Sequence, residues 1–142
     1  MLQKLFSVST YGAKMDFMLL LIRLFFGYAF IMHGYGKILS PFSWMGEDSS
    51  VPGVLQALAA ISEFGGGIAI ILGLFSRLSS IGIACTMAVA IYSSKFIFGL
   101  ELIGKKGGPS YELAAIYFLL SLLFLVAGPG KLSLDKLFFS KK

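Results

Sequence analysis

Two ionisable residues of this chain interrupt long apolar runs. Arg23 lies in DFMLLLIRLFFGYAFIMHGYGKI, which begins at Asp16, and Glu63 lies in ALAAISEFGGGIAIILG. An isolated Arg or Asp at the centre of a bilayer costs about 2.5 to 3.5 kcal/mol, and we expect Glu to behave similarly. Such residues therefore pair with one another, face a polar interior, or reach the membrane surface with their long side chains.

The depths of the two residues predict that they meet. At about 1.5 Å per helical residue, Arg23 lies ~10 Å inside the membrane boundary and Glu63 ~16 Å from the same boundary. We therefore predict that Arg23 and Glu63 form an intramembrane polar site. Gln56 precedes Glu63 on the same helical face and extends this polar stripe toward the outer surface. The alternative is that Arg23 reaches cytoplasmic headgroups and that Glu63 is protonated.

A second polar group is expected at the outer end of the helices. It comprises His33, Lys37, Lys95, Tyr111 and Glu112. His33 is the only histidine and can exchange a proton near neutral pH, so it is either a proton-handling or ligand-binding residue or a hydrogen-bonded interfacial one. A single histidine without neighbouring Cys or Asp ligands makes a poor metal site, and we expect no metal.

The composition indicates an integral membrane protein, because 57% of the residues are hydrophobic and 13% are charged. The net charge of +5 does not indicate nucleic-acid binding, since the basic residues flank the apolar segments. Cys85 is the only cysteine, which excludes an internal disulfide, and we expect it to be a buried packing residue. The first fifteen residues show no signal-peptide pattern, so the first apolar segment is expected to remain in the membrane.

Four apolar segments predict an all-α membrane protein, a bundle of four transmembrane helices in one domain covering residues 1–142. The expected helices cover approximately residues 17–35, 54–75, 78–99 and 111–127. In the second helix Gly65, Ala69 and Gly73 recur every four residues, which favours close helix packing within a chain or in a homo-oligomer. Four crossings place both termini on the side of Arg77, where most basic residues gather, so both termini are predicted to be cytoplasmic.

The chain resembles the DoxX family of small four-helix membrane proteins. The resemblance rests on IRLFFGYAFIMHGYGKI, on EFGGGIAIILGLFSRL and on YELAAIYFLLSLLFLVAGPGKLSLD, and it covers most of residues 20–135. The positions that carry the family pattern are Arg23, Gly27, His33, Gly34, Lys37, Glu63, Gly73, Arg77, Glu112, Gly128, Gly130 and Asp135. One departure is that family members often have a histidine near the outer end of the third helix, where this chain has Ser94 and Lys95.

The resemblance implies a redox-associated subunit in a prokaryotic plasma (inner) membrane, part of a quinone or thiol/sulfur oxidoreductase complex with a soluble partner. A bound quinone or lipid is the expected ligand, since the sequence carries no flavin, haem or iron–sulfur motif. The ligand-binding or proton-handling candidates are Arg23, Glu63, Gln56, His33, Lys37 and Glu112. Two alternatives stay open: a small proton-coupled transporter, and a non-catalytic membrane anchor or assembly factor.

Overall fold

The computed structural model describes residue 8 and residues 11–139 of the chain. Its elements are α2 (Ala13–Leu39), α3 (Gly53–Leu72), α4 (Ser76–Tyr92), the π-helical turn η1 (Ser93–Ile97), the 3₁₀ turn η2 (Lys105–Gly107), α5 (Glu112–Ala127) and α6 (Leu134–Phe139). The bridge between Glu101 and Ser110 is the one departure from helices and loops in this part of the chain. Lys4, Lys141 and Lys142, which contribute to the predicted topology, lie outside the described residues.

Three of these helices are long and apolar enough to cross a membrane. They are α2, α3 and the continuous segment Ser76–Ile97, formed by α4 and η1. Helix α5 is also apolar but has 16 residues, or ~24 Å at the α-helical rise. Large apolar side chains cover the outside of these helices, as lipid contact requires, and Cys85 is exposed on α4 rather than buried as predicted.

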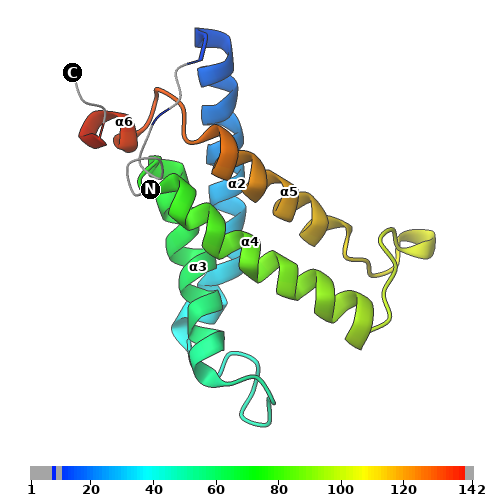
Figure 1. The fold of residues 1–142 in the computed structure, drawn as a ribbon. Coiled ribbons are helices and arrows are strands. Elements are labelled where there is room, and N and C mark those ends of the chain that lie inside the picture. Colours follow the sequence, from blue (N-terminus) through cyan, green and yellow to red (C-terminus); the bar gives the residue numbers. More distant parts are fainter. Residues whose placement is uncertain (1–7, 9–10, 140–142) are drawn as a thin grey trace.

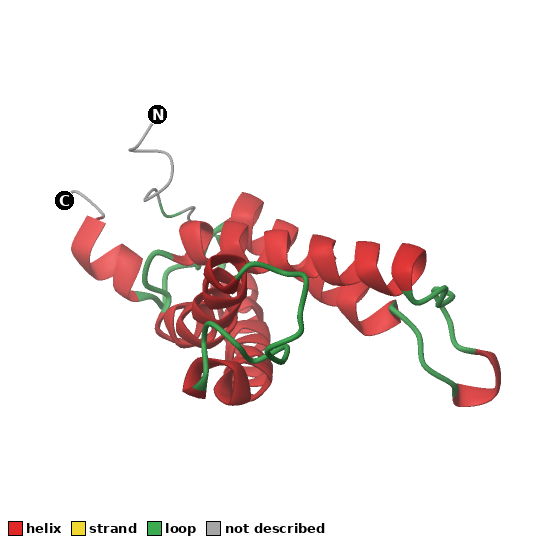
Figure 2. Cartoon of the chain, turned by 90° about the horizontal axis from the view of Figure 1, so that it is seen from below, coloured by secondary structure: helices red, strands yellow, loops and turns green. Residues whose placement is uncertain are grey.

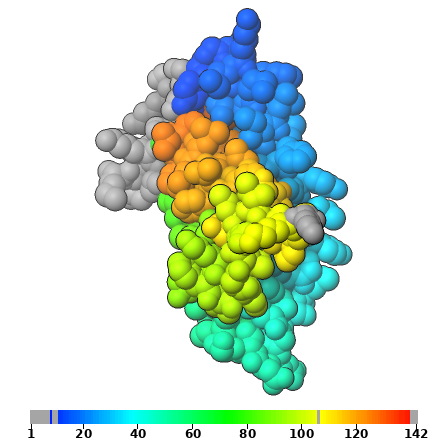
Figure 3. Space-filling model, turned by 90° about the vertical axis from the view of Figure 1, so that its right-hand side faces the viewer, coloured from blue at the N-terminus to red at the C-terminus, as the bar shows by residue number. Residues whose placement is uncertain are grey.

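The helices form two antiparallel hairpins that cross each other. Helices α2 and α3 run side by side, and the α4–α5 hairpin leaves them at an angle (Figure 1). Seen from below, α2 and α3 are viewed nearly end-on while the second hairpin extends away from them (Figure 2). When the molecule is viewed toward the tip of the α4–α5 hairpin, the yellow segment that connects α4 to α5 lies in front of the first hairpin (Figure 3). The architecture is therefore a splayed pair of hairpins.

Glycines allow α2 and α3 to touch backbone to backbone. A Cβ on Gly27 would lie 2.6 Å from the carbonyl oxygen of Gly67, and a Cβ on Gly67 would lie 2.7 Å from that of Gly27. Nearer the C-terminal end of α2, Gly34 packs in the same way against the backbone of Phe64. The predicted small-residue packing of α3 is thus present, but Gly67 makes the contact whereas Gly65 meets only its neighbour Ile61.

Aromatic rings connect the first hairpin to the second. Phe26 and Phe30 of α2 are fully buried, and both contact the ring of Tyr117 on α5. Phe26 also contacts Phe124 of α5, with ring centroids 5.4 Å apart. Because lipid is as apolar as these side chains, their packing and ring geometry hold the hairpins together more than hydrophobic burial does.

The Gly27–Gly67 contact makes a stability prediction. Gly67→Ala should lower the free energy of unfolding in detergent by about 1 to 3 kcal/mol, because the added methyl group forces α2 and α3 apart. Gly36→Ala is the matched control: Gly36 lies on α2 with nothing within 4 Å of its Cβ position, and the change should stabilise the helix by about 0.5 to 1 kcal/mol. Equal stabilities for the two variants would contradict the close contact.

Candidate functional site

The guanidinium of Arg23 is buried and bound entirely to backbone carbonyl groups. Its Nε donates to Ile70 at 2.9 Å and its Nη2 to Ile71 at 2.8 Å. Its Nη1 donates to Pro129 at 2.7 Å and to Leu132 at 2.8 Å. The residue is 1% exposed. Four of its hydrogen bonds therefore join α2 to the end of α3 and to the segment that follows α5.

The end of α3 explains why a cation lies at this depth. The last four carbonyls of a helix lack intrahelical donors, and the helix dipole places partial negative charge there. Ile70 and Ile71 lie in that last turn, where the Gly73 N–H donates to Ile70 at 3.1 Å and Arg23 binds both carbonyls. Gly73 adopts the left-handed conformation with φ of 65°, and a Cβ there would come within 2.5 Å of the Arg23 guanidinium. The glycine ends the helix and leaves room for the arginine.

The predicted pairing of Arg23 with Glu63 is wrong. Antiparallel packing of α2 and α3 places Arg23 opposite Ile70 and Ile71, whereas Glu63 lies opposite Lys37. Glu63 and Ile70 are separated by two turns of α3, about 10 Å along the axis. Depth below one membrane boundary does not give the register of two helices, and the register decides which side chains meet.

A second buried charge, Asp16, holds the start of the same C-terminal segment. Its Oδ1 accepts a hydrogen bond from the backbone N–H of Lys131 at 3.0 Å, and the Lys131 ammonium lies 3.7 Å from its Oδ2. A Cβ on Gly130, which has φ of 78°, would lie 3.1 Å from the same carboxylate. The hydroxyl of Tyr11 adds a bond to the carbonyl of Ala127 at 3.1 Å.

A third buried charge, Asp135, holds the other end of this segment against the turn between α3 and α4. Its carboxylate accepts hydrogen bonds from the backbone N–H of Phe75 at 2.7 Å and of Ser76 at 3.0 Å. Its own N–H donates to Gly73 at 2.9 Å. Phe75 has a positive φ of 49° and no side-chain cap. Asp135 thus supplies the cap that the N-terminus of α4 lacks.

Asp16, Arg23 and Asp135 together form what we call the C-terminal lock. All three are buried, and each binds backbone groups of the turn after α3, of the segment between α5 and α6, or of both. The lock closes one end of the molecule and has its polar groups turned inward. Sequence reasoning placed Arg23 and Asp135 in the family pattern, but it assigned no role to Asp16.

The other end of α2 and α3 carries the ion pair of Lys37 and Glu63. The Lys37 ammonium lies 2.6 Å from Oε1 and 2.7 Å from Oε2 of Glu63. The glutamate side chain is 3% exposed and the lysine side chain 26% exposed. The ammonium also lies 4.5 Å from the centre of the Trp44 ring, a cation–π contact. The pair is therefore covered by the indole but remains open beside the lysine.

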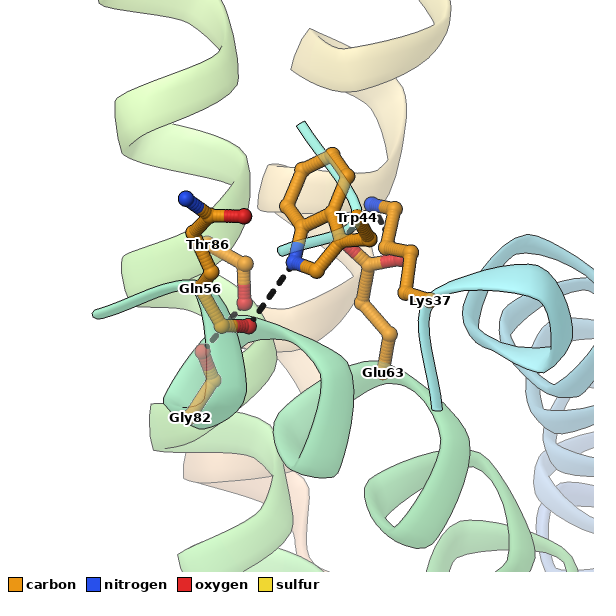
Figure 4. Close-up of polar contacts among 6 residues, drawn as sticks. All are labelled: Lys37, Trp44, Gln56, Glu63, Gly82 and Thr86. Atoms are coloured by element: carbon orange, nitrogen blue, oxygen red, sulfur yellow. Dashed lines mark hydrogen bonds and ion pairs between the residues drawn. The ribbon is translucent and has the colours of Figure 1, made fainter. Parts of the chain in front are cut away.

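Gln56 organises the loop that carries Trp44. Its backbone carbonyl accepts the indole N–H of Trp44 at 2.9 Å (Figure 4). Its side-chain amide accepts from Met45 at 3.0 Å and donates to the carbonyl of Val51 at 2.9 Å. Gln56 and Glu63 are both buried on α3, as their shared helical face predicted. The amide of Gln56 is occupied by the loop, so its part in this site is to position Trp44 over Lys37.

The predicted outer cluster does not form as expected. Lys37 turns toward Glu63, and His33 instead has its ring 5.9 Å from that of Tyr117. Glu112 is exposed in the first turn of α5, and Lys95 lies over the ring of Phe96. His33 and Lys37 lie one turn apart on α2, but His33 contacts Tyr117 of α5 whereas Lys37 binds Glu63 of α3. Among the described residues, no three His, Cys, Asp or Glu side chains gather in a way that could hold a metal ion.

These features define an all-helical integral membrane protein with one polar group of residues at each end of its first hairpin. The chain belongs to the DoxX family, whose model matches residues 18–98. It is 35% identical over 134 residues to an uncharacterized protein of Haemophilus influenzae, across 88% of this chain and 93% of that relative. It is 30% identical over 132 residues to the inner membrane protein YqjF of Escherichia coli, across 89% and 95%. No solved structure matches the chain.

Three findings locate the protein in a prokaryotic inner membrane. They are its membership of the DoxX family, its similarity to the inner membrane protein of Escherichia coli, and its three helices that are long enough to span a membrane.

The C-terminal lock makes a prediction about Arg23. Arg23→Gln leaves several buried carbonyls without a donor, so we expect the free energy of unfolding in detergent to fall by at least about 3 kcal/mol. The exposed Lys14 offers a control near the same end, and Lys14→Gln should stay within about 0.5 kcal/mol of wild type. An Arg23→Gln protein of unchanged stability that has lost a bound small molecule would instead make Arg23 a ligand-binding residue.

Proposed function

We propose that the protein is a redox-associated inner-membrane subunit that binds a quinone-like ligand beside Lys37 and Glu63. The observation that carries the proposal is this ion pair, whose carboxylate is buried while its ammonium is partly open. Ionisable residues at membrane depth usually belong to substrate, ion or proton paths. Arg23 has no part in the proposed ligand site, because its hydrogen bonds hold backbone groups.

The chemistry of the pair suits a quinone headgroup. An ammonium has three N–H donors, and the two oxygens of Glu63 take two of them. The third can bind a quinone carbonyl oxygen at the open side of Lys37. Reduction of a quinone adds two electrons and two protons, and a Lys–Glu pair can pass protons to the reduced oxygens. The electrons would come from a soluble oxidoreductase partner of the thiol or sulfur class.

The same proposal includes a fourth crossing by α5 with both termini in the cytoplasm. Support comes from the apolar sequence of α5 and from its antiparallel course along α4. Lys14, Arg77 and Lys131 lie at the end of the molecule where α2 begins, in agreement with the positive-inside rule.

A C-terminal fusion tests this topology. We expect a green fluorescent protein fused after residue 142 to fluoresce in cells, and an alkaline phosphatase fused there to be inactive, because each folds on one side of the membrane. The reverse pattern would rule out four crossings with cytoplasmic termini. Fusion of the same reporters within residues 102–108, between α4 and α5, should give the opposite result and serves as the internal control.

Extraction of the purified protein tests the ligand. We expect mass spectrometry to find a quinone with the wild-type protein, and Lys37→Gln and Glu63→Gln to retain at most about a tenth as much, since a lost hydrogen bond to a charged group is worth about 1.5 kcal/mol or more. Glu101 and Lys105 form an exposed ion pair at 2.8 Å. Glu101→Gln is therefore the matched control and should retain the quinone.

A second candidate, a non-catalytic anchor or assembly factor, is favoured by the C-terminal lock, whose buried charges bind backbone groups that hold the fold together. For this candidate, wild type and the Lys37 and Glu63 variants carry no quinone and assemble equally well with their partner. That result would reject the quinone proposal.

A further inference from the structure

The turn between α3 and α4 marks a surface of the bilayer. Both α3 and the segment Ser76–Ile97 are long and apolar enough to cross a membrane. Gly73, Leu74 and Phe75 are the only residues between them. Two consecutive spanning helices joined by so short a connection reverse direction at a membrane face, since backbone outside a helix is not tolerated in contact with lipid. The position of this turn therefore locates other parts of the chain.

Helix α6 is fixed to this turn. Asp135 in its first turn accepts hydrogen bonds from Phe75 and Ser76 and donates one to Gly73. The rings of Phe75 and Phe139 add a contact, with centroids 5.8 Å apart. Figures 1 and 2 show that α6 runs crosswise to α2 and α3. With the membrane normal along α2 and α3, a helix that runs crosswise to them at the level of the α3–α4 turn lies along the membrane surface.

The outward side of α6 is apolar. Leu137 is 72% exposed and Phe138 is 64% exposed, while Asp135 faces inward. Six residues are too few to span a bilayer. A short helix with a buried polar anchor and exposed leucine and phenylalanine side chains fits the boundary between headgroups and acyl chains. The position of α6 at the turn therefore identifies lipid as the material that covers these side chains.

Arg77 provides a charged group at the same surface. It is the second residue of α4, and its Nε is buried with no hydrogen-bond partner among the described residues. Its guanidinium packs against Gly128, where a Cβ would lie 3.1 Å from Nη2. Asp135 already occupies the first N–H groups of α4. Arg77 is partly exposed, so the Nη groups of its guanidinium, unlike the buried Nε, are left to bind an external anion, and phosphate is an anion that arginine binds well.

We propose that the face formed by Arg77 and α6 is a binding site for an anionic phospholipid. Arg77 binds the headgroup phosphate, and Leu137 and Phe138 insert beside the first carbons of the acyl chains. This inference does not depend on the proposed quinone site, which lies at the other end of α2 and α3. The occupant is a membrane lipid with a net negative charge, because a zwitterionic headgroup offers the arginine no net attraction.

Native mass spectrometry of the full-length protein tests the proposed binding of the headgroup phosphate by Arg77. The protein is released from micelles containing equal amounts of phosphatidylglycerol and phosphatidylcholine, and the two bound lipids are compared. We expect phosphatidylglycerol to predominate in wild type. Arg77→Gln should lower the ratio of bound phosphatidylglycerol to bound phosphatidylcholine about fivefold, which is the effect of one basic residue near a membrane surface. Arg77→Lys keeps the charge and should keep most of the preference.

Two controls distinguish binding at this site from a general attraction of anionic lipids to the basic residues of the protein. Lys105 is exposed at the far side of the chain, and Lys105→Gln should retain the wild-type preference. Millimolar inorganic phosphate should not displace the lipid, because phosphate lacks the acyl chains. A wild-type preference in a stably folded Arg77→Gln protein, or displacement by phosphate, would overturn the proposal.

Fluorescence quenching tests the apolar part. Trp44 is the only tryptophan, so Phe138→Trp in a Trp44→Phe background gives one reporter on α6. In vesicles of brominated phosphatidylglycerol we expect lipids brominated near the headgroup to quench it more strongly than those brominated near the chain ends. Strong quenching by aqueous iodide together with none by brominated lipid would show that α6 faces water, and the insertion of Phe138 would be rejected.

Discussion

The structure depends on one interaction, the guanidinium of Arg23 against four backbone carbonyls. A charge in an apolar environment must be compensated, and a helix end in the same environment has carbonyls without donors. In this protein the two requirements satisfy each other. Ile70 and Ile71 supply acceptors from α3, and Pro129 and Leu132 supply them from the segment after α5. The arginine is thus a structural crosslink made of hydrogen bonds.

The two ends of the first hairpin use charge in different ways. At the C-terminal lock, the carboxylates of Asp16 and Asp135 bind backbone N–H groups, so the charges are enclosed by the fold. At the opposite end of this hairpin, Lys37 and Glu63 bind each other and no backbone group in the described contacts. A side chain that holds no backbone can change its partner without unfolding a turn. This difference is why the proposed ligand site lies beside Lys37 and Glu63.

The sequence predicted the helices better than it predicted their contacts. The apolar runs gave the four main helices, though α2 extends a turn beyond residues 17–35 at each end, and α6 was not predicted because six residues leave no periodic pattern. The pairing of Arg23 with Glu63 failed because depth along a helix does not give register, which here follows from Gly27 meeting Gly67. Backbone carbonyls are also invisible as partners in a sequence, since every residue has one.

The long separation between Arg23 and half of its partners has a consequence for biogenesis. Pro129 and Leu132 lie 106 and 109 residues further along the chain. Because synthesis proceeds from the N-terminus, α2 and α3 enter the membrane while these carbonyls do not yet exist. The nascent hairpin therefore holds a guanidinium that is satisfied on the side of α3 alone. Its last two acceptors arrive when the second hairpin and the segment after it have been made, so the C-terminal lock closes only after all four main helices exist.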